Sequence, residues 1–210
     1  MLFILVGKSG SGKSTLFKEL PGRKIPTVTT RPRRDNEEAN EYIFTSIEEF
    51  EESLKKGLYL AYKRYETTHG EYFYGTRTIY FSKGLLSRHV YSIILDPVGA
   101  LQIANQCLKR GIQYQIVYLT APEHIRRERI ANRGDDYAEY NRRAIIEKMD
   151  STFYTFELGH AYYDYADIRI DTTNQLHVNK FITYVTSLIE IQNNSENELY
   201  KTLYNPVEGV

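Results

Sequence analysis

The sequence predicts an α/β fold in which helices flank a central parallel sheet. Residues 2–6 (LFILV) form a continuous apolar run, which is typical of a strand buried on both faces. A Gly/Ser-rich loop at 7–12 and a helical segment at 14–20 follow, as in the first half of a βαβ unit. Beyond residue 77 the alternation returns, with strands expected at 90–95, 113–119 and 167–170, and helices expected at 99–110, 122–134, 136–157 and 175–191.

The composition limits the classes of protein that the chain can represent. Its 210 residues predict one domain, and 27 Lys and Arg balance 27 Asp and Glu. Zero net charge argues against general attraction to nucleic acid or to an anionic membrane. Cys107 is the only cysteine, which excludes an intrachain disulfide and a multi-cysteine zinc site. The run at 2–6 is too short for a signal peptide or a membrane span, so we expect a cytoplasmic protein.

Residues 22–76 interrupt the α/β pattern and predict an inserted lobe. They show no clean period, apart from an acidic helix expected at 47–56 and β-prone residues after it. The core of the domain is then 1–21 and 77–191. From Gln192 the chain is polar and rich in Asn and Glu, which predicts a tail over 192–210. Alternatively, this segment packs against a partner subunit, as in a homodimer.

The glycine-rich loop is the strongest chemical signal, because residues 7–14 (GKSGSGKS) fit the pattern G-x-x-x-x-G-K-[ST]. Glycines let successive N–H groups point at phosphate oxygens. Lys13 would place a charge on the β and γ phosphates, and the Ser14 hydroxyl is a hard oxygen ligand suited to Mg²⁺. The loop therefore predicts a bound nucleoside triphosphate such as ATP. The expected ATP-binding residues are Lys8, Ser9, Gly10, Ser11, Gly12, Lys13, Ser14 and Thr15.

Asp96 is the second candidate for the donor site. It ends the apolar segment VYSIIL, so its carboxylate is expected at the carboxyl edge of a strand, facing the phosphate loop. There it could hold Mg²⁺ directly or through water. Alternatively, Asp96 only begins a turn before Pro97.

A basic loop at 27–34 (TVTTRPRR) is a candidate for holding a second phosphate group. Arg31 and Arg34 lie three residues apart, beside hydroxyl side chains. Two guanidinium groups can hold a dianionic phosphate with fork geometry. The alternative is a basic surface loop balanced by the acidic residues that follow it.

Taken in order, these segments resemble the guanylate kinase family over about residues 1–191. The resemblance is carried by GKSGSGKST, then TTRPRRDNEEANEYIF, then YFYGT and IILD. It implies a P-loop kinase in which the lobe binds the acceptor nucleotide. Residues implied to hold the acceptor phosphate are Arg31, Arg34, Tyr42 and Tyr74, and Thr27 and Thr76 are implied to face the base.

The resemblance also implies a helical lid over about 124–145 that closes on the donor. Arg126, Arg129 and Arg133 recur at i, i+3 and i+7, on one stripe of a helix. Arg129, Arg133 and Arg143 match the arginine positions of the family and, with Lys13, would neutralise charge on the transferring group. The alternative is a solvated helix with local acidic partners.

Two positions depart from the family pattern. The glutamate that reads guanine in the family falls near Leu60, with no acid before Glu66, and a second aspartate of the family is replaced by Val98. Unpaired guanine donors in a buried pocket would be costly. Either Glu66 or Glu71 supplies a carboxylate, or the base differs, as with thymine or a modified pyrimidine.

The expected function is transfer of the γ-phosphoryl group of ATP to a nucleoside monophosphate, with GMP or dGMP favoured and Mg²⁺ held by Ser14 and Asp96. The partners would be small-molecule nucleotides. One alternative is a kinase of the same fold with another deoxynucleotide, a ribose bisphosphate or a modified DNA base as acceptor. Another is a non-catalytic binding module, against which the intact Gly12-Lys13-Ser14 argues.

Overall fold

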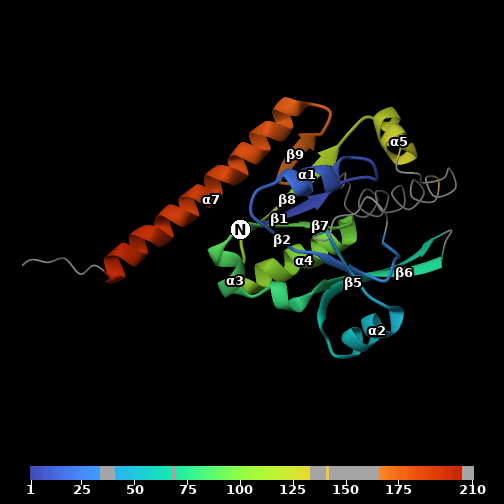
Figure 1. Cartoon of the computed structure of the whole chain (residues 1–210), viewed down its shortest axis with the longest axis horizontal. Coiled ribbons are helices and arrows are strands. Elements are labelled where there is room, and N and C mark those ends of the chain that lie inside the picture. Colours follow the sequence, from blue (N-terminus) through green and yellow to red (C-terminus); the bar gives the residue numbers. More distant parts are fainter. Residues whose placement is uncertain (34–40, 68–69, 133–140, 142–165, 205–210) are drawn as a thin grey trace, which may run out of the picture.

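The computed structural model describes residues 1–33, 41–67, 70–132, 141 and 166–204, with the backbone alone for 196–204. Its centre is a five-stranded sheet in the order β2-β7-β1-β8-β9, and every neighbouring pair is parallel. The strands are β1 (Leu2–Val6), β2 (Arg23–Lys24), β7 (Tyr91–Ile94), β8 (Tyr114–Thr120) and β9 (Ile168–Asp171). The prediction of a central parallel sheet flanked by helices is confirmed (Figure 1).

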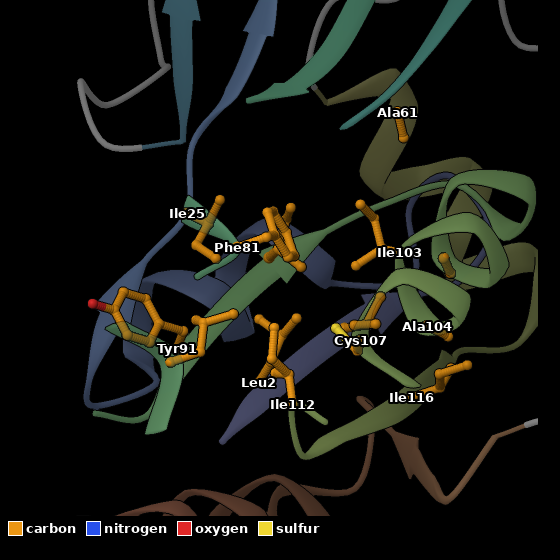
Figure 2. Close-up of a cluster of buried hydrophobic side chains, with 14 of the residues drawn as sticks. Leu2, Ile25, Ala61, Phe81, Tyr91, Ile103, Ala104, Cys107, Ile112 and Ile116 are labelled. Carbon is orange, nitrogen blue, oxygen red and sulfur yellow. The ribbon is translucent and has the colours of Figure 1, made fainter. Parts of the chain in front are cut away.

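Helices cover both faces of this sheet because β1 alternates its apolar side chains between two cores. Leu2 and Ile4 join one core with α3 (Lys83–Arg88) and α4 (Pro97–Arg110), part of which Figure 2 shows. Phe3 and Leu5 join the other core with α1 (Lys13–Glu19) and α7 (Gln175–Tyr204). All five residues of β1 are fully buried, as expected for a strand between two helical layers. This rigid centre holds the loop that follows β1.

The inserted lobe is a four-stranded sheet in the order β4-β3-β6-β5. Its strands are β3 (Thr27–Thr29), β4 (Tyr42–Phe44), β5 (Tyr59–Thr67) and β6 (Gly70–Arg77). Helix α2 (Ile47–Lys55) begins with a capping box in which Ser46 and Glu49 satisfy each other's backbone N–H groups. In Figure 1 the lobe and α2 lie on one side of the central sheet.

The first boundary of the lobe differs from the sequence-based one. Arg23 and Lys24 form β2 and pair with Tyr91 and Ser92, so they belong to the central sheet rather than to the lobe. Two residues cannot show a strand period, which is why the sequence alone did not reveal them.

The C-terminal segment also differs, because α7 continues to Tyr204 instead of ending near residue 191. Neither Gly nor Pro occurs between Gln175 and Tyr204, so nothing in the polar segment stops the helix. The apolar stripe ends earlier, and beyond it α7 leaves the central sheet (Figure 1). No described helix is long and apolar enough to cross a membrane.

Candidate active site

The phosphate loop connects β1 to α1 and depends on glycine. Gly10 and Gly12 have left-handed φ angles of 77° and 86°. A Cβ atom on Gly10 would lie 2.6 Å from the carbonyl oxygen of Arg126, a residue of α5 (Glu123–Ala131). Glycine therefore permits both the turn and the close approach of α5 to the loop. All eight predicted ATP-binding residues lie in this loop and in the first turn of α1.

The lysine of the loop lies close to the loop backbone. The Lys13 ammonium group donates hydrogen bonds to the carbonyl oxygens of Gly7, at 2.6 Å, and Lys8, at 3.0 Å. The buried hydroxyl of Ser11 has no hydrogen-bond partner within the described part of the chain. A polar, lysine-bearing cradle with an unsatisfied donor suits an anion rich in oxygen atoms.

Two arginines of α5 contact the same loop. The Arg126 guanidinium donates to the carbonyl of Ser9 at 3.3 Å, and that of Arg129 donates to the carbonyl of Gly10 at 3.1 Å and to the Thr172 hydroxyl at 3.0 Å. The structure thus brings Arg129 to the donor loop, together with Arg126, whose role the sequence left open. Arg133 and Arg143, most of the expected lid and the helix expected at 136–157 lie outside the described residues.

Asp96 caps a helix and pairs with a lysine. It is the N-cap residue of α4, where its Oδ1 accepts hydrogen bonds from the backbone N–H groups of Val98 and Gly99. The Lys63 ammonium of β5 lies 3.6 Å from the same oxygen. Part of the carboxylate's hydrogen-bonding capacity is therefore used within the protein.

Ser14 contacts a carboxylate that the sequence analysis missed. Its hydroxyl donates a 2.7 Å hydrogen bond to Oε1 of Glu41, which directly precedes β4. The backbone carbonyl of Glu41 accepts from Thr27 N–H, so this residue is tied to β3 as well. The only sequence signal is an acid before the aromatic strand at 42–44, and chain separation hid its partner.

Three of the four expected acceptor-phosphate residues, Arg31, Tyr42 and Tyr74, form one cluster on the lobe. Arg31 is 9 % exposed; its Nε donates to the Tyr74 hydroxyl at 3.1 Å, and its guanidinium lies 5.3 Å from the centre of the Tyr42 ring. The rings of Tyr42 and Tyr74 are in edge contact. Arg34, the fourth expected member, lies outside the described residues.

The β5–β6 hairpin defines which residues share the face of this cluster. Ala61 pairs with Thr76, and Lys63 pairs with Tyr74, so these four side chains lie on one face. A register irregularity between Tyr59 and Ala61 makes Ala61, rather than Leu60, the residue opposite Thr76. Thr76 on this face and Thr27 of β3 are both buried.

The two acids proposed as substitutes lie on the other face of the hairpin. Glu66 and Glu71 pair with each other, out of phase with Lys63 and Tyr74. Arg64 binds both acids, at 3.4 Å and 2.6 Å. They are therefore not positioned to replace a carboxylate opposite Thr76.

The fold places a glycine-rich phosphate loop on a parallel sheet, arginines of α5 against that loop and an arginine–tyrosine cluster on an adjoining lobe. This is the arrangement of a P-loop phosphotransferase. The family model described as guanylate kinase matches residues 1–166. The chain is 32 % identical over 152 residues to a guanylate kinase of Lactiplantibacillus plantarum, covering 68 % of this chain and 70 % of that one. It is 30 % identical over 215 positions to a guanylate kinase of Streptococcus pyogenes serotype M1, covering 93 % and 96 %.

A solved guanylate kinase structure from Anaplasma phagocytophilum has a similar fold, with a TM-score of 0.56 at 17 % identity, over 99 % of this chain and 96 % of that one. The chain belongs to the guanylate kinase family, and it is an enzyme of the nucleoside monophosphate kinase type.

Proposed function

We propose that this enzyme transfers the γ-phosphoryl group of ATP to GMP or dGMP, releasing ADP and the nucleoside diphosphate. An oxygen of the acceptor phosphate attacks the γ-phosphorus, and the bond to the β,γ-bridging oxygen breaks, leaving its electron pair on ADP. The acceptor phosphate is already ionised, so catalysis needs positioning and charge neutralisation rather than a general base.

The observation that carries this proposal is the Ser14–Glu41 hydrogen bond together with the Arg31 cluster. The bond ties the lobe to the phosphate loop, and the cluster belongs to that lobe. A donor triphosphate on the loop and an acceptor phosphate on Arg31, Tyr42 and Tyr74 would then face each other across the lobe boundary. We further propose that Arg34 contacts the acceptor phosphate and that Thr27 and Thr76 face the base of the acceptor.

On the donor side, Lys13 and Arg129 would neutralise the charge that develops on the transferring group, and we add Arg133 and Arg143 to this role. Serine and carboxylate oxygens suit Mg²⁺, a hard cation, so Ser14 and Asp96 are the residues that we propose to hold it. When bound with ATP, the ion would neutralise the β and γ phosphates.

A second candidate function is the same phosphoryl transfer with a nucleoside monophosphate that carries a different base. It is favoured by the hairpin face that Thr76 shares with Ala61 and Lys63. On this face the Ala61 side chain has no hydrogen-bonding group, and Lys63 is paired with Asp96. Guanine offers two neighbouring donors, whereas the Lys63 ammonium is itself a donor and suits a carbonyl oxygen. A pyrimidine with carbonyl groups would fit such a face.

The test is a coupled assay of ADP release with Mg-ATP and each ribo- and deoxyribonucleoside monophosphate, with IMP included. Dominant turnover of GMP or dGMP supports the proposed acceptor, and a low rate with IMP would show that the guanine amino group is read. Dominant turnover of a pyrimidine monophosphate would support the second candidate. ATP binding without turnover of any acceptor would favour a binding module instead.

A further inference from the structure

Glu41 is a little-exposed acidic residue whose carboxylate contacts the phosphate loop. It is 8 % exposed, and the Ser14 hydroxyl is its one side-chain hydrogen-bond donor among the described residues. No lysine or arginine in that part of the chain forms an ion pair with it. A carboxylate has two oxygens and about four lone-pair sites, so one hydroxyl donor leaves most of its capacity for accepting interactions unused. A cation beside Ser14 would therefore be attracted to this position.

The direction of the hydrogen bond determines what Ser14 can do next. A hydroxyl group has one proton and two lone pairs, and the proton of Ser14 points to Glu41. Its lone pairs are then left for a hard cation on the phosphate side. Partners that orient a metal ligand in this way govern metal affinity strongly, although they do not touch the metal.

We propose that Glu41 is a positioning residue for the divalent cation of the donor site. It orients the Ser14 hydroxyl and contributes one negative charge behind it. This inference rests on the proposed function for the presence of a cation and a nucleoside triphosphate. Because Glu41 is held to β3 by the Thr27 N–H group, cation binding is also linked to the position of the acceptor lobe.

The test measures Mn²⁺, as a probe of the Mg²⁺ site, by electron paramagnetic resonance with a non-hydrolysable ATP analogue. Glu41→Gln keeps the size and the acceptor oxygen but removes the charge, and Mn²⁺ affinity should fall about 10- to 100-fold. In EDTA, affinity for the analogue alone should be unchanged or higher, because a negative charge near the triphosphate is gone.

Glu66→Gln is the matched control, since it makes the same change on an exposed side chain of the far hairpin face. It should leave both affinities unchanged. Glu41→Asp keeps the charge with a shorter side chain, so it should lose less Mn²⁺ affinity than Glu41→Gln. If the Gln variant does not fold, the Asp variant should still weaken Mn²⁺ binding without weakening metal-free analogue binding.

Unchanged Mn²⁺ affinity in Glu41→Gln would overturn the inference. So would equal losses of metal-free and metal-dependent analogue binding, which would mean that Glu41 only holds the lobe in place. These readouts involve no acceptor, so they are separate from the choice of monophosphate. Failure of the wild-type chain to bind the analogue at all would instead contradict the proposed function.

Discussion

Arg31 illustrates how a charged side chain is kept ready at a nearly buried position. Its guanidinium is held by the Tyr74 hydroxyl, by the face of Tyr42 and by the carbonyl of Pro32. These contacts restrict its rotamers before any ligand arrives, which reduces the entropy lost on binding. Arginine suits this position because its planar group can stack on a ring and still present N–H donors.

We expect Arg31→Ala to raise the KM for the acceptor monophosphate about 10- to 100-fold, with little change in the KM for ATP. The reason is the loss of a charge-assisted contact to a phosphate, worth about 1.5–3 kcal/mol. Steady-state kinetics with each substrate varied in turn measures the split. Arg33→Ala, on an exposed side chain of the same loop, serves as the control. A normal acceptor KM would remove Arg31 from the proposed clamp.

The partly buried Lys24 makes the free energy of unfolding depend on pH. Burial lowers the pKa of Lys24 to about 8, below the value near 10.4 expected for an unfolded lysine. Between these values the folded protein has lost a proton that the unfolded chain retains, so this group makes the free energy of unfolding rise with pH. Denaturant unfolding from pH 7 to 10 should show a smaller rise in Lys24→Met. Parallel curves for the two proteins would contradict the prediction.

At the scale of elements, the site depends on the contact between the phosphate loop and α5. The Arg126 backbone lies where a side chain on Gly10 would be, while the Arg126 and Arg129 side chains return to the loop carbonyls. The loop conformation and the placement of the arginines are therefore linked. A change in one glycine should disturb both.

Gly10→Ala should reduce affinity for an ATP analogue at least about tenfold and destabilise the fold by about 1–3 kcal/mol. The methyl group would meet the Arg126 carbonyl, and alanine disfavours a φ of 77°. Calorimetric titration and denaturant unfolding measure the two effects. In Gly84→Ala the added methyl group meets open space within α3, and stability should rise by about 0.5–1 kcal/mol. Wild-type analogue affinity in Gly10→Ala would show that the loop tolerates the change.

At the scale of the whole molecule, α7 covers the core that contains Phe3 and Leu5, on the α1 side of the central sheet. Phe181 packs edge-on against Phe3 of β1, with ring centres 5.3 Å apart, and it is 5 % exposed. Val178 and Val185 lie on the same buried stripe. The contact joins α7 to β1, the strand that leads into the donor site.

Phe181→Ala should lower the free energy of unfolding by about 3–5 kcal/mol, because it removes a buried ring and leaves a cavity. Denaturant unfolding measures the change. Leu176→Ala on the same helix is the control, since Leu176 is 58 % exposed and its truncation should cost within about 0.5 kcal/mol. Similar losses for both variants would contradict the assigned packing of α7.

The sequence by itself determined the α/β class and the phosphate loop. A buried strand, a glycine-rich turn and closely spaced residue types are local properties, and local physics decides them. β2 is not predictable from the sequence because two residues carry no period. The end of α7 is not predictable because its polar residues lack the apolar stripe that marks a packed helix. The position of the residue opposite Thr76 depended on an irregularity of strand register that composition does not encode.

Only the tertiary structure decided which polar and charged groups meet. Ser14 and Glu41 are 27 residues apart, and Lys63 reaches Asp96 from a different sheet. Such pairs form because the lobe folds back onto the core, and the chain separation between them follows no repeat that sequence reasoning can use. The donor loop was therefore readable from residues 7–14 alone, whereas its carboxylate partner became visible only in three dimensions.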